Sequence, residues 1–561
     1  MLKIRPIILI LCSAALLSIA ACSRKEEVKA GASLLDSTLL ARIPASTGFF
    51  AVWDTESDGY KTFKESPWAK NRPGLYQACE KLPVMESDTL PRLCKSLKTA
   101  GFIQGPEVQS ATVRETIVFA GLNNTSKAPE GGVYFSAASG VNLRDKLNSL
   151  ESALKSDGFS VNKQDFQGGS GFSVELPAVS KGQLPITALY AGATSTSFGV
   201  ATTPALIDQL FVQNPESGLP RIKSSPEFSR LNSIAGNRAG QIFYAYLDLA
   251  FTMKSLTQSG LLQADTAPVK PAEFPLDAAL AVSYMDENPA GFLLVSATPR
   301  NDDQKRWLSA FSTEGDLGAL KQLPAEAALA LGLDGKTITS LKDAALNEQP
   351  SDQKAAISAQ LAPLDGIKSL GLALLGAAGA SPVPSLVLTF QSADLVKLQT
   401  SLKEGLSRAV TQTGLPVSGW QQRKVASLET DIMQSPMMGL GAFLASTDKT
   451  LILASSEDAL KKSIDAINGK SASTLGKSLT DKSKAMYEQG SPLAAVYTNY
   501  GKLADLIESF QGTVAAFTAG QSTMDDEKIA SMRAMGVQVG ALAFKDGVFR
   551  ARMTMERPQV P

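Results

Sequence analysis

One short segment of the chain has the residue types and spacing of a calcium-binding loop. Counted from its first aspartate, carboxylates occupy the first, third, fifth and twelfth positions and a glycine occupies the sixth, in the order Asp54, Glu56, Asp58, Gly59, Glu65. Ca²⁺ prefers oxygen ligands, and this order of ligands allows one loop to wrap around the ion. The sequence therefore makes Asp54, Glu56, Asp58 and Glu65 candidate ligands of a structural calcium ion, and no other cofactor is expected.

The same segment also has a simpler interpretation. Glu56 stands where EF-hand loops usually carry Asp or Asn, and Lys61 stands where they carry an aliphatic residue. The segment follows a predicted strand, whereas an EF-hand loop follows a helix. A similar segment that begins at Asp334 lacks the other acids. We therefore favour a structural turn, in which the aspartate caps the next helix.

The chain contains no histidine. Catalytic Ser-His-Asp and Cys-His systems, His-ligated zinc and imidazole proton shuttles are therefore excluded. Ser152-Ala153-Leu154-Lys155 fits the Ser-x-x-Lys pattern of penicillin-recognising enzymes, but no Lys-Thr-Gly motif follows it. We assign no catalytic residue and expect a protein that is not an enzyme.

Composition and charge narrow the class of protein further. Hydrophobic residues make up 44% of the chain, which favours a folded globular protein. The 54 basic residues are balanced by 54 acidic ones, so no nucleic-acid partner is expected. The four tryptophans are interpreted as core residues, with a ligand platform as the alternative: Trp53, Trp68, Trp307 and Trp420.

The N-terminus has the pattern of a secretory signal peptide. Lys3 and Arg5 precede an apolar run at 7–17, which is too short to span a bilayer as a helix. We predict a signal peptide over residues 1–21. Beyond it, residues 22–35 are small and polar, which predicts a flexible tether.

The end of this signal peptide, Ile19-Ala20-Ala21-Cys22, resembles the lipobox of bacterial lipoproteins. The resemblance implies that Cys22 is acylated, with palmitate or a similar fatty chain, and becomes the first mature residue. Ser23 after the cysteine implies sorting to the outer membrane by that family's rule. We expect a lipoprotein that is anchored to the membrane by its lipid and faces the periplasm.

Two further cysteines remain after processing. Cys79 and Cys94 flank a segment that contains proline, and a disulfide between them would stabilise the fold by about 3 kcal/mol. We predict this disulfide because the protein is expected outside the cytosol. Two buried reduced thiols are the alternative.

The chain also matches itself weakly, as an internal repeat. Three pairs of segments correspond: Ile43-Pro44-Ala45 with Leu323-Pro324-Ala325, Val133-Tyr134-Phe135 with Leu386-Val387-Leu388, and Gly199-Val200-Ala201 with Ile452-Leu453-Ala454. The offset is 280 residues for the first pair and 253 for the others, so the first copy is the longer one. We predict two related halves, residues 36–300 and 301–561.

The coarse pattern within each half is hairpins interrupted by single helices. Leucines at helical spacing predict helices at 143–157 and 392–410, and apolar runs joined by polar turns predict hairpins at 186–202 and 440–455. This order favours an α+β fold, with antiparallel sheet in each half and amphipathic helices packed on one face.

Two short motifs each occur twice in the chain. The first is a Pro-Ala motif before a strand, in Ile43-Pro44-Ala45-Ser46-Thr47 and Leu323-Pro324-Ala325-Glu326, and the second is a Ser-Pro helix start, in Ser66-Pro67-Trp68 and Ser225-Pro226-Glu227-Phe228. Together they resemble motifs of an uncharacterised family of bacterial envelope proteins. Ser46 stands where the family has Asp. The resemblance implies placement and architecture but no activity.

We therefore expect a lipid-anchored envelope protein of non-catalytic binding or scaffolding type. Its partners would be the membrane, through the N-terminal lipid, and an envelope protein or a hydrophobic ligand. A carrier or chaperone for a lipid or another hydrophobic ligand is the alternative. A histidine-free hydrolase is a third hypothesis, which requires a carboxylate pair or a Ser-Lys pair in a cleft.

Overall fold

A computed structural model of the chain describes most of its length. The described residues are 34, 43, 47–66, 89–102, 113–122, 129–166, 169–176, 188–211, 222, 225–236, 240–252, 275–285, 288–311, 315–347, 350–377, 384–413, 416–435, 441–470, 473–488, 492–517 and 526–556.

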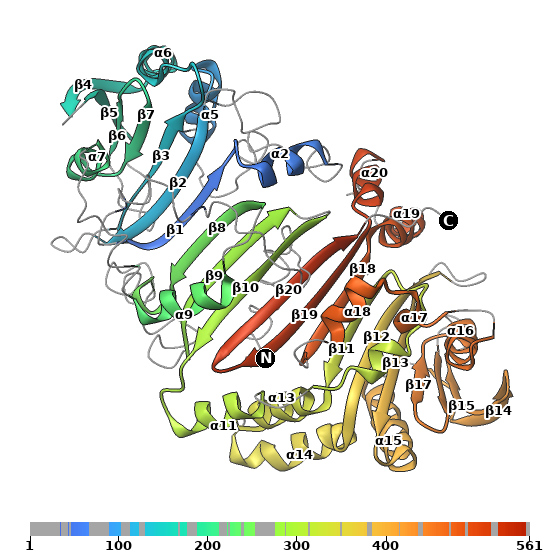
Figure 1. Ribbon diagram of the computed structural model, residues 1–561. Helices are drawn as coiled ribbons and strands as arrows, with labels where there is room; N and C mark the ends of the chain where they lie inside the picture. The colour runs from blue at the N-terminus through green and yellow to red at the C-terminus, as the bar shows by residue number, and fades with distance from the viewer. Residues whose placement is uncertain are drawn as a thin grey trace. The chain divides into compact units, whose positions relative to one another are not determined.

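The chain divides into two compact units. The first unit is Lys25–Arg300, and the second unit is Asn301–Pro561 together with Met1–Arg24, which lies outside the described residues. Both units mix helices with strands, and their strands pair antiparallel (Figure 1). The α+β class predicted from the sequence is therefore confirmed.

The first unit is built on one run of paired strands. Its strands are β1 (Thr47–Asp54), β2 (Val113–Leu122), β3 (Pro129–Ala137), β4 (Ser160–Phe166), β5 (Gly169–Glu175), β6 (Ala188–Ala193), β7 (Ser197–Ala201), β8 (Gln241–Asp248), β9 (Leu276–Met285) and β10 (Pro289–Ala297). Its helices are α2 (Asp58–Glu65), α5 (Thr89–Thr99), α6 (Leu143–Ser156), α7 (Pro204–Phe211) and α9 (Pro226–Ala235). The strands pair in the order β10-β9-β8-β1-β2-β3-β7-β6-β5-β4.

The second unit has its own run of paired strands. These are β11 (Leu329–Asp334), β12 (Ile367–Ala377), β13 (Pro384–Ser392), β14 (Gln421–Val425), β15 (Leu428–Gln434), β16 (Gly441–Ser446), β17 (Leu451–Ala454), β18 (Ala494–Asn499), β19 (Val537–Lys545) and β20 (Val548–Glu556). They pair in the order β20-β19-β18-β11-β12-β13-β17-β16-β15-β14. In this order β11 holds the place of β1, β12 that of β2, and so on to β20 and β10.

The helices of the second unit connect these strands. They are α11 (Asp302–Ala310), α12 (Gly318–Lys321), α13 (Gly335–Asn347), α14 (Ser351–Leu361), the 3-10 turn η4 (Ala362–Leu364), α15 (Leu395–Thr413), α16 (Glu457–Asn468), α17 (Leu475–Ser478), α18 (Asp481–Glu488), α19 (Tyr500–Phe517) and α20 (Asp526–Ala534).

Helix α6 shows why the leucine spacing was informative. The side chain of Asn142 accepts a hydrogen bond from the backbone N–H of Arg144 and so caps the start of the helix. Gly158, just past its end, has a φ of 79°, a backbone conformation that glycine adopts without strain. The predicted helix at 143–157 is confirmed. Its predicted apolar face is buried: Leu143, Leu147, Leu150 and Leu154.

The predicted hairpins are also present. The hairpin expected at 186–202 is the pair β6 and β7, and the one expected at 440–455 is the pair β16 and β17. Short polar turns join both pairs, and the apolar residues of each strand face the packed interior. Apolar runs joined by polar turns therefore located these strands to within a few residues.

The helices pack on both faces of the sheet, so the prediction of one covered face is wrong. In strand β7, Phe198 lies in the cluster under α6, while a side chain at Gly199 would meet Leu210 of α7. Successive residues of a strand point to opposite faces, so α6 and α7 cover opposite sides of β7. The error arose because both faces of this short strand are apolar, which the order of hairpins and helices in the sequence does not reveal.

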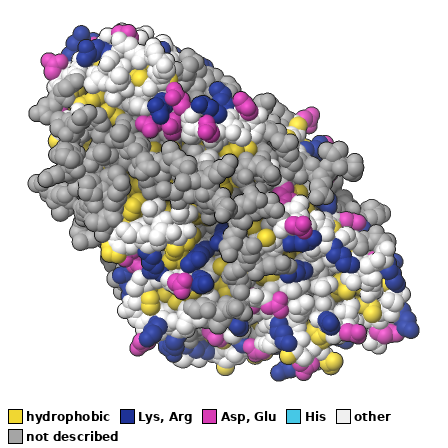
Figure 2. Space-filling view, viewed as in Figure 1, with side chains coloured by type: hydrophobic (Ala, Val, Ile, Leu, Met, Phe, Trp, Pro, Cys, Tyr) yellow, Lys and Arg dark blue, Asp and Glu magenta, His cyan; other side chains and the backbone are white. Residues whose placement is uncertain are grey.

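Charged side chains of both signs lie between the apolar ones on the surface. In Figure 2, Lys and Arg are interspersed with Asp and Glu over the described part of the face shown.

Among the described residues, helices that combine the length and the apolar character needed to cross a membrane are absent.

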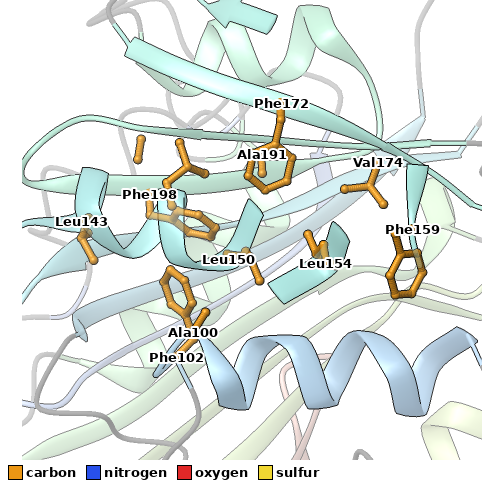
Figure 3. Packing of buried hydrophobic residues seen from close by; sticks show 12 residues of the cluster. Ala100, Phe102, Leu143, Leu150, Leu154, Phe159, Phe172, Val174, Ala191 and Phe198 are labelled. Carbon is orange, nitrogen blue, oxygen red and sulfur yellow. The ribbon is translucent and has the colours of Figure 1, made fainter. Parts of the chain in front are cut away.

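A hydrophobic core of the first unit lies between α5, α6 and strands β5 to β7 (Figure 3). The rings of Phe102 and Phe198 approach to 4.6 Å between centroids, and Phe172 is 1% exposed. Burying an aromatic or leucine side chain stabilises a fold by about 2 kcal/mol. This cluster therefore holds α5 and α6 against the sheet.

A polar clamp also fastens α5 to the end of α6. The carboxylate of Asp157 accepts hydrogen bonds from Lys95 Nζ at 2.6 Å and from Ser96 Oγ at 2.7 Å. Arg92 Nε donates to the backbone oxygen of Asp157 at 3.1 Å, and its guanidinium lies over the ring of Phe159. The hydrogen bonds from Lys95 and Ser96 hold the pKa of Asp157 below its ordinary value of 3.8.

Leu34, near the end of the predicted tether, is held in the first unit. Leu34 is 7% exposed, and its backbone N–H donates to Gln241 Oε1 at 3.0 Å. Gln241 is itself 4% exposed, at the start of β8. A buried side chain and a buried hydrogen bond therefore fix the chain at Leu34, and the rest of the predicted tether lies outside the described residues.

We predict that Asp157→Asn loosens α5 at neutral pH. The stabilising contribution of this carboxylate is present above pH 3.8 and is lost as the pH falls through the lowered pKa of the folded state. Amide hydrogen exchange in α5 should be severalfold faster in the variant than in the parent at pH 7, and the difference should vanish in acid. Asp145→Asn, an exposed change on α6, is the control. Equal exchange at pH 7 would contradict the clamp.

Candidate functional site

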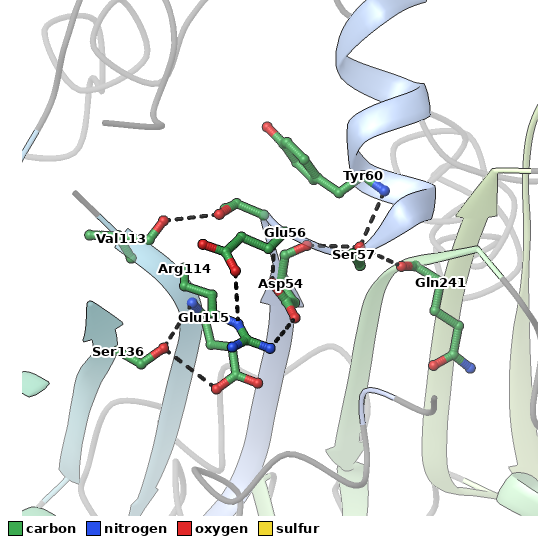
Figure 4. Close-up of polar contacts among 10 residues, drawn as sticks. Asp54, Glu56, Ser57, Tyr60, Val113, Arg114, Glu115, Ser136 and Gln241 are labelled. Carbon is green, nitrogen blue, oxygen red and sulfur yellow. Dashed lines mark hydrogen bonds and ion pairs between the residues drawn. The ribbon is translucent and has the colours of Figure 1, made fainter. Parts of the chain in front are cut away.

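The turn after β1 uses Asp54 to hold its own backbone (Figure 4). Asp54 Oδ1 accepts from the backbone N–H of Glu56 at 2.7 Å, and Ser57 Oγ donates to the backbone oxygen of Asp54 at 2.8 Å. Ser57 then caps α2 by accepting from the N–H of Tyr60. Arg114 of β2 lies 3.7 Å from Asp54 and 3.5 Å from Glu56, so one guanidinium balances both carboxylates.

The four candidate calcium ligands do not converge. Asp58 and Glu65 are the first and last residues of α2, which places them about 10 Å apart along the helix axis. Gly59 lies inside this helix against Gly240, whose oxygen would be 2.0 Å from an added Cβ. Close packing therefore explains the glycine. Across the described residues, no cluster of three or more His, Cys, Asp or Glu side chains could hold a metal ion.

Asp54, Asp248, Asp334 and Asn499 each end a strand that runs into a helix, and capping by the side chain is seen directly at three of them. Each side-chain oxygen accepts a backbone N–H two or three residues ahead: Asp248 from Phe251, Asp334 from Lys336 and Thr337, and Asn499 from Lys502. At the fourth junction Asp54 holds the turn and Ser57 caps the helix. Asp334 is the most buried of these side chains, at 2% exposure, and also accepts from the N–H of Asp316.

The predicted cysteine sites fall largely outside the described residues. Cys22 and Cys79 are not among them, and Cys94 is placed in α5 by its backbone alone. The lipidation of Cys22 and the disulfide between Cys79 and Cys94 therefore remain predictions.

The Ser-x-x-Lys match on α6 is not a reactive pair. Ser152 Oγ donates to the backbone oxygen of Asn148 at 3.0 Å, and Lys155 forms an ion pair with Glu151 at 2.7 Å. Ser152 and Lys155 are solvent-exposed on the helix surface. Without a cleft and without a hydrogen bond to a base, this serine has no means of activation.

An open groove lies along one side of α15 in the second unit. Its volume is about 610 Å³, and the residues that line it are Thr400, Lys403, Glu404, Ser407, Arg408 and Trp420. The five helical residues are three or four positions apart and therefore share one face. Trp420 comes from the segment just before β14 and forms a wall against that face.

The floor of this groove is held by satisfied polar contacts. Lys403 Nζ pairs with Asp431 Oδ2 of β15 at 2.9 Å, and the same oxygen accepts from Gln399 Nε2 at 2.9 Å. Trp420 Nε1 donates to Ser407 Oγ at 2.9 Å, and the ammonium of Lys403 lies 5.5 Å from the centre of the Trp420 ring. These contacts fix the indole against the helix.

Two charged side chains at the groove are open to solvent. Glu404 and Arg408 are both exposed and stand one helical turn apart, yet they form no ion pair with each other. Arg408 Nε donates only to the backbone oxygen of Glu404, at 3.4 Å. Within the described residues the Glu404 carboxylate has no hydrogen-bond partner. The groove thus offers one free donor group and one free acceptor group beside an indole.

This arrangement can bind a ligand but does not activate a nucleophile. Ser407 Oγ donates its one hydrogen to the backbone oxygen of Lys403 at 2.8 Å and accepts from Trp420, and neither of these partners is a base that could activate it. Lys403 forms an ion pair with Asp431. The groove residues therefore favour recognition over chemistry.

Sequence reasoning missed this groove because no sequence motif links Trp420 to the exposed face of α15 that it lies against. Trp420 was assigned to the core, and it does pack against the core cluster of the second unit while it also lines the groove. The polar face of α15 opposite its leucines is an ordinary solvent-exposed pattern in sequence. Only the fold of the segment before β14 brings the indole to it.

We predict that Asp334→Ala destabilises the protein by about 1 to 3 kcal/mol, because buried N–H groups lose their acceptor. Asp334→Asn keeps an acceptor oxygen and should cost less. Urea unfolding measures both changes, with Asp58→Asn on the exposed start of α2 as the control, expected within about 0.5 kcal/mol of the parent. An unchanged unfolding free energy in Asp334→Ala would rule out the capping role.

No known protein family, curated protein or solved structure matches this chain.

Proposed function

We propose that this protein is a lipid-anchored component of the bacterial cell envelope that binds or scaffolds other envelope components and is not an enzyme. The signal-peptide pattern and the motif that ends in Cys22 support the anchor. We place the protein at the outer membrane, facing the periplasm, because Ser23 follows the cysteine.

The groove on α15 is the observation that carries the binding role. Its lysine and serine are committed to neighbouring residues, whereas Glu404 and Arg408 face solvent beside a half-buried indole. Aromatic walls with a few open polar groups are typical of ligand sites. The carrier hypothesis has weaker support, because the described apolar side chains around α6 pack against one another (Figure 3).

We also infer that the two units arose by duplication. Their strands pair in corresponding order, and the matching sequence segments lie in corresponding strands, residues 133–135 in β3 and 386–388 in β13. Residues 199–201 and 452–454 lie in β7 and β17 in the same way. One ancestral unit would supply a stable frame whose surface changed separately in each copy.

The entry of the chain at Leu34 limits how far the folded body can lie from the bilayer. Between Cys22 and Leu34 an extended chain spans at most about 40 Å. Because the Leu34 N–H is held by Gln241, the start of β8 would stay within that distance of the acylated end. The anchor would therefore keep the first unit close to the membrane surface.

Labelled palmitate tests the anchor. The parent chain, expressed with its leader in a Gram-negative host, should incorporate the label and partition with the outer membrane. Cys22→Ser should lose the label, because the acylated thiol is gone. Cys94→Ser keeps Cys22 and should stay labelled. Label that persists in Cys22→Ser, or that is missing from the parent chain, would contradict the anchor.

Purification of the acylated protein from its own membranes tests the binding role. We expect an envelope component to co-purify in an amount comparable to the protein and to be identified by lipid, glycan and protein mass spectrometry. Co-purification should fall in a Glu404→Ala, Arg408→Ala double variant. A protein that purifies alone from intact membranes would contradict the role.

A further inference from the structure

We propose that the groove on α15 binds a neutral oligosaccharide. This inference names the ligand class of the binding role proposed above and rests on it. The inference rests on the charge, the pairing and the exposure of the residues that line the groove, which are Thr400, Lys403, Glu404, Ser407, Arg408 and Trp420.

The free polar groups of the groove match hydroxyl chemistry. A hydroxyl donates one hydrogen bond and accepts two, whereas a guanidinium only donates and an ionised carboxylate only accepts. Neighbouring sugar hydroxyls can therefore accept from Arg408 and donate to Glu404 at the same time. Both side chains are exposed on adjacent turns of α15, so a single sugar ring can reach both.

The charges of the groove disfavour an ionic ligand. Lys403 is already balanced by Asp431, at 2.9 Å. The remaining charges, on Glu404 and Arg408, have opposite signs and cancel. An anion attracted by Arg408 would be repelled by Glu404, and a cation attracted by Glu404 would be repelled by Arg408. A neutral polar ligand is repelled by neither side chain.

Trp420 supplies the apolar surface that a sugar ring also needs. Its indole N–H is held by Ser407, which fixes the ring beside the open side chains before any ligand arrives. A rigid aromatic wall with a polar rim loses little side-chain freedom on binding. The groove is open rather than enclosed, so we expect modest affinity, with Kd of about 1 mM for a trisaccharide.

The probes are two neutral trisaccharides, tri-N-acetylchitotriose and maltotriose, with trigalacturonate as an anionic comparison. The protein is the full mature chain with Cys22→Ser, which removes the predicted acylation site. Binding is followed by saturation-transfer NMR and by tryptophan emission at sugar concentrations up to about 10 mM, ten times the expected Kd. We expect at least one neutral sugar to bind and trigalacturonate to bind more weakly.

Four variants locate the site. Glu404→Ala and Arg408→Ala should each weaken binding by about tenfold, because each removes a hydrogen bond between the sugar and a charged group. Lys397→Ala, an exposed change on the same helix outside the groove, should leave binding unchanged. Trp420→Phe should abolish the change in emission. Circular dichroism and thermal unfolding check that the two alanine variants, at exposed positions, remain folded.

Several outcomes would overturn the inference. These are no binding of either neutral sugar at about 10 mM, unchanged binding in both alanine variants, and tighter binding of trigalacturonate than of the neutral sugars. The palmitate experiment is independent of these results. If the parent chain incorporates palmitate but the protein binds no sugar, the ligand class alone is refuted. If the parent chain incorporates no palmitate but the protein binds sugar, the anchor alone is refuted.

Discussion

The rest of the structure depends on strands that are buried on both faces. In β17, Leu451 and Ile452 are successive residues and both are fully buried, although they point to opposite sides. A strand of this kind needs a helix on each side, and α15 and α16 flank this part of the second unit. The positions of the helices are therefore set by the faces of the sheet that they cover. The positions of the loops and turns that carry polar groups are set in turn by the helices that they connect.

This constraint explains which parts of the fold the sequence could predict. Leucines at helical spacing located α6, and its capping residues Asn142 and Gly158 set its ends. Hairpins were recognised because their strands are short and their turns polar. The second covered face was missed, since an uninterrupted apolar run such as the one in β17 fits burial on one side or on two equally well.

The candidate sites were harder to predict, for reasons that also follow from the fold. The carboxylates from Asp54 to Glu65 have calcium-loop spacing, but Ser57 starts a helix inside the segment and spreads them along its axis. Local capping takes precedence over ligand spacing here. The groove on α15 was invisible for the opposite reason, because Trp420 becomes its wall only after the chain has turned back before β14.

The two units carry different polar features, although their strands pair in corresponding order. In the first unit, Arg92, Lys95 and Ser96 of α5 fasten that helix to Asp157 at the end of α6. In the second unit, α15 extends over Leu395–Thr413 and carries an open groove with Trp420 beside it. In our account the first unit, entered at Leu34, lies near the membrane anchor, and the second unit supplies the recognition surface.

Mass spectrometry of the N-terminal peptide from the membrane-extracted protein tests the central claim most directly. The account predicts a chain that begins at residue 22, with the added mass of a glyceride and fatty chains on that cysteine. A mature chain that begins elsewhere, or an unmodified Cys22, would contradict it.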